Sequence, residues 1–143
     1  MKKYILSVLP VLIASSLTVA NADVNMHEGL WKMTVQTEMS GMPMQMQIPA
    51  TSFTQCLTKK DLIPKDQEGK KGKCKIIKQD ISGDTVNWVM ECHEEAKMTA
   101  IGTATYHGDS FEGSTDITTV IPQMGTMKMK QKITGKRIGE CKK

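Results

Sequence analysis

The sequence has few aromatic residues, no closely spaced cysteines and little surplus charge, and each shortage excludes a class of protein. Tryptophan, tyrosine and phenylalanine make up only 4% of the 143 residues. None of the four cysteines stands in the C-x-x-C spacing that structural zinc sites usually use. A nucleophile elbow, a zinc-binding helix, a phosphate-binding loop and a paired-carboxylate cluster are all missing. We therefore expect a protein that is not an enzyme and needs no cofactor.

One short motif invites comparison with an enzyme family. Gly108-Asp109-Ser110-Phe111 is similar to the G-D-S-L block of serine hydrolases. Those enzymes need an α/β scaffold, oxyanion donors and a later Asp-x-x-His segment, none of which the sequence contains. The four residues are instead typical of a hairpin turn in which the glycine takes a positive φ.

The first 22 residues have the layout of a secretory signal. Lys2 and Lys3 precede an apolar stretch over 4–14, and Ala20-Asn21-Ala22 matches the A-x-A cleavage pattern. A retained membrane anchor is the alternative, but the uncharged stretch is near the lower limit for spanning a bilayer. No cysteine follows the small residues, which argues against a lipoprotein anchor. We expect residues 1–22 to be a cleaved signal peptide and residues 23–143 to be a single β domain, periplasmic or secreted.

The chain after the signal is small and nearly balanced in charge. Removing 22 residues from 143 leaves 121, which suffices for one domain with one core. Without Lys2 and Lys3, 17 of the 19 basic residues remain against 15 acidic ones. Nucleic-acid binding needs a clustered basic surface and is not expected. No second apolar run approaches a membrane span, so the exported protein should be soluble.

Period-two alternation dominates after the signal, and helical periodicity is nearly absent. Thr58 and Asp61 resemble a capping box, which predicts one short helical turn before Pro64. The absence of crossover helices predicts an all-β antiparallel meander of about seven strands. It should form a barrel of the calycin or lipocalin type or an open curved sheet, stapled by disulfides. The expected strands cover 29–38, 44–56, 73–81, 85–92, 96–106, 110–121 and 126–138, with Pro49 at an edge or a bulge.

The cysteines predict two disulfides, as expected for an even number in a small exported domain. If Ser82-Gly83-Asp84 is a three-residue loop, Ile81 pairs with Thr85 and Cys74 lies opposite Cys92. Opposite residues of an antiparallel pair are within disulfide reach. We therefore favour Cys74–Cys92 with Cys56–Cys141. The main alternative joins Cys56 to Cys74 and Cys92 to Cys141.

Methionine is unusually common, with 12 residues in the chain. Thioethers are soft ligands that select Cu(I), so the two groups of methionines in the chain form a candidate copper site. His27, His93 and His107 are available as further copper ligands. The alternative is that methionine fills an irregular core or an apolar ligand-facing surface. The inward positions of Met127 and Met129 favour that alternative. The candidate copper ligands are Met39, Met42, Met44, Met46, Met124, Met127 and Met129.

Gly29-Leu30-Trp31 resembles the G-x-W signature of lipocalins and their calycin relatives. In those barrels a basic residue of the last strand packs over the tryptophan, a position that Arg137 would take here. The alternative is that Trp31 is an ordinary core residue. Trp31, Trp88 and Arg137 are the candidates for a ligand site or a barrel end.

Lysines are concentrated near the middle of the chain. Outside the cytoplasm such a cluster could contact anionic envelope lipids or an acidic partner. Asp66 and Glu68 interrupt it, however, which favours an ordinary solvated loop. The cluster consists of Lys65, Lys70, Lys71, Lys73, Lys75 and Lys78.

Several motifs together resemble a known family. They include Gly-Leu-Trp at 29–31, Met-Ser-Gly-Met-Pro-Met at 39–44, Phe-Thr-Gln-Cys-Leu at 53–57 and Trp88 with Cys92. Two more are the run from Tyr106 to Gly113 and the run from Gly135 to Cys141. The chain after the signal is similar throughout to an exported bacterial family catalogued as domain of unknown function 3617. The resemblance implies a small β domain of Gram-negative bacteria and no activity.

Three functional hypotheses follow. The first is a non-enzymatic envelope protein that binds a small apolar ligand or lipid, by analogy with barrel-like folds. The second is a periplasmic Cu(I)-binding protein that uses the methionine clusters. The third is a structural or partner-binding module with a filled core and no ligand.

Overall fold

A computed structural model describes residues 23–40, 47–63, 74–93 and 96–142. The described residues contain no helix, and the seven strands are antiparallel, which confirms the all-β prediction. They are β1 (Gly29–Ser40), β2 (Gln47–Leu57), β3 (Cys74–Ser82), β4 (Thr85–His93), β5 (Lys97–Tyr106), β6 (Ser110–Ile121) and β7 (Gly125–Gly139).

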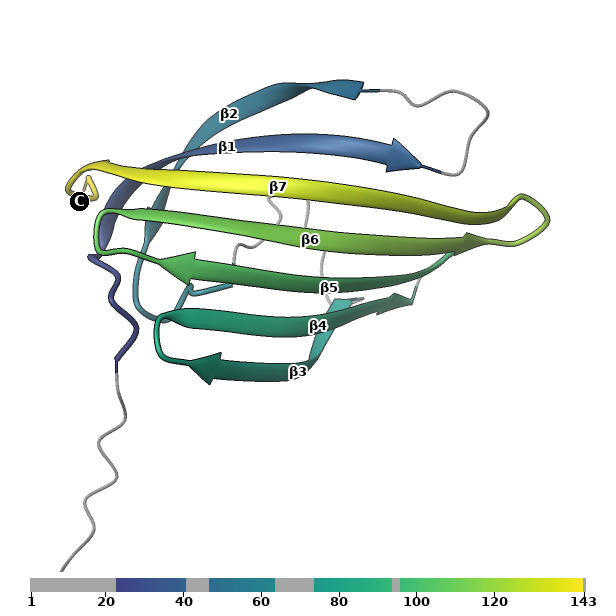
Figure 1. Cartoon of the computed structure of the whole chain (residues 1–143), viewed down its shortest axis with the longest axis horizontal. Helices are drawn as coiled ribbons and strands as arrows, with labels where there is room; N and C mark the ends of the chain where they lie inside the picture. The colour runs from purple at the N-terminus through teal and green to yellow at the C-terminus, as the bar shows by residue number, and fades with distance from the viewer. Residues whose placement is uncertain (1–22, 41–46, 64–73, 94–95, 143) are drawn as a thin grey trace, which may run out of the picture.

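The strands form one open sheet in the order β2-β1-β7-β6-β5-β4-β3 (Figure 1). Every strand except β2 pairs with the strand that follows it in the chain, and β1 also pairs with β7. This is the order of an up-and-down barrel that has been opened between β2 and β3. The open curved sheet, and not the closed barrel, is therefore the architecture. Pro49 lies on the edge strand β2, as expected.

The β3–β4 hairpin differs from the predicted loop. Ser82 pairs with Thr85, so the turn contains only Gly83 and Asp84, with Gly83 at a φ of 59°. The register then shifts between Ile76 and Lys78, and the extra residue of this bulge brings Cys74 opposite Cys92. The loop length was wrong, but the cysteines still pair because the bulge compensates for it.

Both disulfides are present with the favoured pairing. Cys74–Cys92 joins β3 to β4, and Cys56–Cys141 ties the edge strand β2 to the segment after β7, with Cα–Cα distances of 4.0 and 5.5 Å. All four cysteines of the chain are therefore bonded. Such bonds persist in oxidising compartments, which indicates a location outside the cytoplasm. Within the described ranges, no helix is long and apolar enough to cross a membrane.

The core occupies one end of one face of the sheet, which we call the inner face. Phe111 lies at its centre, with ring centroids 5.7 Å from Trp31 and 5.2 Å from Tyr106. Glycine makes room for two of the large rings. A Cβ at Gly135 would overlap Phe111, and one at Gly102 would overlap the indole of Trp88. The main core residues are Val24, Met26, Trp31, Met33, Leu57, Val86, Trp88, Ala104, Tyr106, Phe111 and Ile133.

Two non-strand segments cover this end of the core. Residues 23–28 run along the β5–β6 turn, where Met26 forms a bridge with Gly108. After β2, Thr58 Oγ1 donates to Asp61 Oδ2 at 2.8 Å, and Asp61 N donates to the Thr58 carbonyl. Within the described residues, 58–63 contain a turn and not the predicted helical turn. It places the Leu62 carbonyl 2.6 Å from the Tyr106 hydroxyl, which donates to it.

Candidate functional site

Beyond the core, the inner face carries apolar side chains that remain partly exposed. The strand register aligns them in rows that cross the sheet. The first apolar row contains Met39, Met129, Ile117, Ala100, Met90 and Ile76, and the second contains Met127, Thr119, Met98 and Cys92. Only Ala100 and Cys92 are buried in these rows, and Ile76 on the edge strand is 47% exposed. Among the described residues, the two rows form a continuous apolar surface, of which Met90 packs against the core.

A polar row separates this surface from the core. It consists of Thr37, Gln131 and Thr115 on β1, β7 and β6, and on β5 and β4 the same register line reaches Gly102 and the core residue Trp88. The three polar side chains are half-buried. On β2, at the core end of the same face, Gln55 Oε1 is buried without a hydrogen-bond partner. The inner face therefore offers hydrogen-bonding groups next to its apolar rows.

The structure brings together three of the seven candidate copper ligands. Met39 and Met129 are directly opposite on β1 and β7, and Met127 follows on the same face of β7. Met124 lies in the β6–β7 turn and is 80% exposed. Met42, Met44 and Met46 lie outside the described residues. Within the described ranges, no group of three histidine, cysteine or acidic residues is arranged to hold a metal.

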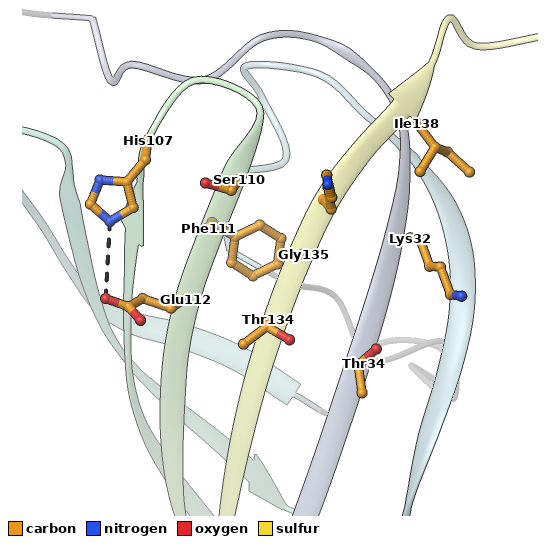
Figure 2. A pocket seen from close by; sticks show the side chains of 10 residues that line it. Lys32, Thr34, His107, Ser110, Phe111, Glu112, Thr134, Gly135 and Ile138 are labelled. Carbon is orange, nitrogen blue, oxygen red and sulfur yellow. Dashed lines mark ion pairs between the residues drawn. The ribbon is translucent and has the colours of Figure 1, made fainter.

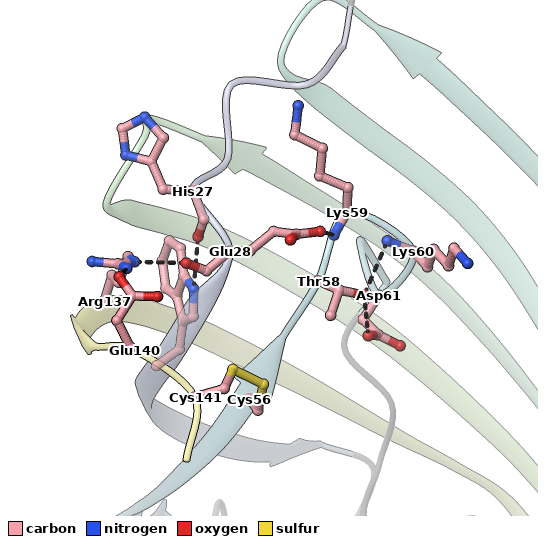
Figure 3. The surroundings of a disulfide bond; sticks show 11 residues. His27, Glu28, Cys56, Thr58, Lys59, Lys60, Asp61, Arg137, Glu140 and Cys141 are labelled. Carbon is pink, nitrogen blue, oxygen red and sulfur yellow. Dashed lines mark hydrogen bonds and ion pairs between the residues drawn. A yellow bond between two sulfur atoms is a disulfide. The ribbon is translucent and has the colours of Figure 1, made fainter. Parts of the chain in front are cut away.

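Trp31 and Arg137, the residues of the G-x-W pattern, lie in adjacent strands at one end of the sheet. They are register partners on β1 and β7, and Trp31 is fully buried. The Arg137 Nε donates to the Glu28 carbonyl at 2.8 Å, and its guanidinium pairs with Glu140 (Figure 3). Arg137 also explains Gly29, because a Cβ there would collide with the guanidinium.

Hydrogen bonds and a disulfide close this end of the sheet. Trp31 Nε1 donates to the His27 carbonyl at 3.1 Å, and the Cys56–Cys141 disulfide lies beside the Glu28 and Arg137 contacts (Figure 3). Trp88 shares the core but lies on β4 against Gly102, away from Arg137. Both tryptophans are buried, and Trp88 also lines a hollow of about 540 Å³.

The opposite, outer face carries the lysines of β7 and a hollow of about 570 Å³. Figure 2 shows Lys32 and Thr34 on one side of this hollow and His107 with Glu112 on the other. We call it the outer groove. Its remaining lining residues are Ser110, Phe111, Thr134, Gly135, Lys136 and Ile138.

The predicted lysine cluster is only partly described. Lys75 and Lys78 are exposed on the edge strand β3. Lys65, Lys70, Lys71 and Lys73 lie outside the described residues. The clustering of the whole group in space therefore stays a prediction.

Sequence reasoning placed Met127 and Met129 on an inward face but did not find the apolar rows or the outer groove. Both depend on the pairing of β1 with β7, two strands at opposite ends of the chain. The alternation of lysine with methionine or isoleucine in β7 was the one available signal for two chemically different faces.

No curated protein matches the chain, and no solved structure matches it either. The family described as Protein of unknown function (DUF3617) matches residues 26–141, which is most of the chain and includes every described strand. The chain therefore belongs to the DUF3617 family.

Proposed function

We propose that this is a periplasmic or secreted, non-enzymatic envelope protein that binds a small apolar ligand or a lipid chain on its inner face. The two apolar rows carry the proposal, because within the described ranges their half-buried methionine and isoleucine side chains, apart from Met90, lie outside the core of this face. Methionine is flexible and adapts to ligands of different shape. Such a surface suits an apolar ligand of variable structure.

The dimensions of the first apolar row fit an extended chain. It crosses six strands, so five strand spacings of about 4.8 Å give a length of about 24 Å. Each methylene group removed from water contributes about 0.8 kcal/mol. A lipid chain along this row would gain binding energy along its whole length.

The polar row and the open sheet support the same ligand class. Thr37, Gln131 and Thr115 run beside the first apolar row and can bond a hydroxyl or ester group of an amphipathic molecule. The sheet is not closed, because β2 and β3 form no ladder with each other. A chain lying on the inner face need not thread through a closed barrel end.

A fluorescent apolar probe tests the proposal. N-phenyl-1-naphthylamine should bind the wild-type protein with saturable fluorescence, and Ile117→Lys should abolish this binding because it puts a charge in the first apolar row. Val120→Lys is the matched control, since Val120 lies on the outer face of the same strand and is 47% exposed. Equal binding by both variants would contradict an inner-face site, and no saturable binding by the wild type would reject the proposal.

The facing thioethers of Met39 and Met129 favour a second candidate function, Cu(I) binding. Soft thioether ligands select Cu(I), and Met127 offers a third sulfur on the same face. The double variant Met39→Leu and Met129→Leu keeps the surface apolar but removes two sulfurs. It should lose Cu(I) in competition with bicinchoninate while still binding the naphthylamine probe. If the double variant still binds both Cu(I) and the naphthylamine probe, copper does not bind at this pair of methionines and the apolar proposal stands.

A module that binds neither ligand is the third candidate. It predicts no probe binding, no Cu(I) retention and no thermal shift with lipids. Contact of Lys65, Lys70, Lys71, Lys73 and Lys75 with an anionic envelope surface is compatible with all three candidates. Replacing the exposed Lys75 alone tests only the described part of that cluster.

A further inference from the structure

The outer groove contains two lysines directly opposite each other. Lys32 on β1 and Lys136 on β7 are register partners on the outer face, and both are exposed. Directly opposite residues of an antiparallel pair have Cβ atoms about 5 Å apart, so like charges there repel. Among the described residues, neither lysine has a carboxylate within ion-pair distance.

Two other lysines on the same face of β7 form ion pairs. Lys132 Nζ lies 3.3 Å from Glu38 Oε1, and Lys130 Nζ lies 3.6 Å from Asp116 Oδ1. Glu112 is the acidic residue of the groove, but its carboxylate lies 4.0 Å from the His107 ring at the rim (Figure 2). No described carboxylate forms an ion pair with Lys32 or Lys136, although Glu112 lines the same groove.

Hydroxyl groups surround the two ammonium groups. Ser110 is the β6 partner of Lys136, and the next row holds Thr34 opposite Thr134. Thr34 Oγ1 and Ser52 Oγ are 2.9 Å apart and share one hydrogen bond, so one of these two hydroxyls keeps a free proton. Ammonium and hydroxyl donors at this density match an anion with several oxygens.

We propose that the outer groove binds a phosphate-type oxyanion between Lys32 and Lys136. The two ammonium groups contact the anion, and the hydroxyls of Ser110 and Thr134 donate to its remaining oxygens. The anion relieves the repulsion between the lysines, neither of which forms an ion pair with a described carboxylate. This site is independent of the inner face, because it lies on the other side of the sheet.

Titration of the protein with inorganic phosphate, followed by amide NMR, tests the site. Saturable shifts should be concentrated at the groove residues, and Lys32→Gln or Lys136→Gln should weaken binding at least about threefold. Lys132→Gln is the matched control, because it removes the same charge from the same strand face but from an existing ion pair with Glu38. Both groove variants should melt no lower than the wild type, since each removes a repulsive neighbour.

Vesicles then identify the source of the phosphate group. A lipid headgroup is the ligand if three results agree. Vesicles containing phosphatidylglycerol bind the protein, phosphatidylcholine vesicles do not bind it, and Lys136→Gln weakens the binding to phosphatidylglycerol. If phosphate binds but neither vesicle does, the ligand is a free phosphate compound. The proposal is overturned if the groove amides do not shift, or if Lys132→Gln weakens phosphate binding as much as Lys136→Gln.

Discussion

The buried phenol of Tyr106 should make the free energy of unfolding fall at alkaline pH, and Tyr106→Phe should remove this pH dependence. The Tyr106 side chain is fully buried, and its hydroxyl donates to the Leu62 carbonyl at 2.6 Å. Burial, with a smaller contribution from the charge of Asp61, raises the pKa of the Tyr106 phenol well above its usual value of 10.0. In the unfolded chain the phenol should titrate normally.

The sign and size of the effect follow from proton linkage. Above pH 10 the unfolded chain loses the phenolic proton while the folded protein keeps it, so the free energy of unfolding falls as the pH rises. At about pH 11.5, which is about 1.5 units above the unfolded pKa, this loss amounts to about 2 kcal/mol. Below pH 10 the contribution of Tyr106 to stability is fully present.

Tyr106→Phe is the matched variant because it keeps the ring. At neutral pH it should be less stable by about 1–3 kcal/mol, since the Leu62 carbonyl loses its donor. The deficit should shrink by about 2 kcal/mol near pH 11.5, where only the wild type has a phenol to ionise. Urea unfolding of both proteins at several pH values measures this difference, and the titration of lysines cancels between them.

Tyrosinate absorbance gives a second readout. Tyr106 is the only tyrosine of residues 23–143, so the ultraviolet titration of that chain reports this phenol alone. Absorbance should rise only as the protein unfolds. A phenol that ionises near pH 10 in the folded protein, or a stability difference that does not change with pH, would refute the reasoning.

Two further predictions concern the disulfides and the glycines. Replacing Cys56 and Cys141 by Ala should lower the free energy of unfolding by about 4.6 kcal/mol, because the disulfide closes a loop with a separation of 85 residues. Urea unfolding measures this change, and a loss below about 1 kcal/mol would contradict the prediction. Gly102→Ala should cost about 1–3 kcal/mol by forcing the Trp88 indole to move, whereas Gly139→Ala, which has open space, should be neutral in the same assay. Equal melting temperatures for the two glycine variants would show that Trp88 does not pack on Gly102.

Much of the fold could be predicted because strand alternation is local. The alternation of lysine with methionine in β7 identified both faces of that strand before any partner was known. The Cys74–Cys92 pairing was predicted from a three-residue hairpin loop, and it is correct because a bulge compensates for the shorter turn. The bulge between Ile76 and Lys78 could not be predicted, because a bulge shifts the register without changing the composition of the strand.

The candidate sites were harder to predict because they combine distant strands. The apposition of Met39 with Met129, like that of Lys32 with Lys136, exists only because β1 pairs with β7. Hydrophobic periodicity shows which face a residue takes but not which strand lies beside it. The register pairing of Trp31 with Arg137 also joins the two ends of the chain, and the G-x-W pattern is the one sequence signal that relates those ends.

Native mass spectrometry of protein recovered from the envelope of the producing cell tests the inner-face proposal most directly. The wild type and Val120→Lys should both show an added mass in the range of a lipid or small apolar molecule. Ile117→Lys, which carries the same charge on the inner face, should show the bare mass. A bare mass for the wild type, together with no binding of the naphthylamine probe, would contradict the proposal that the inner face binds an apolar ligand.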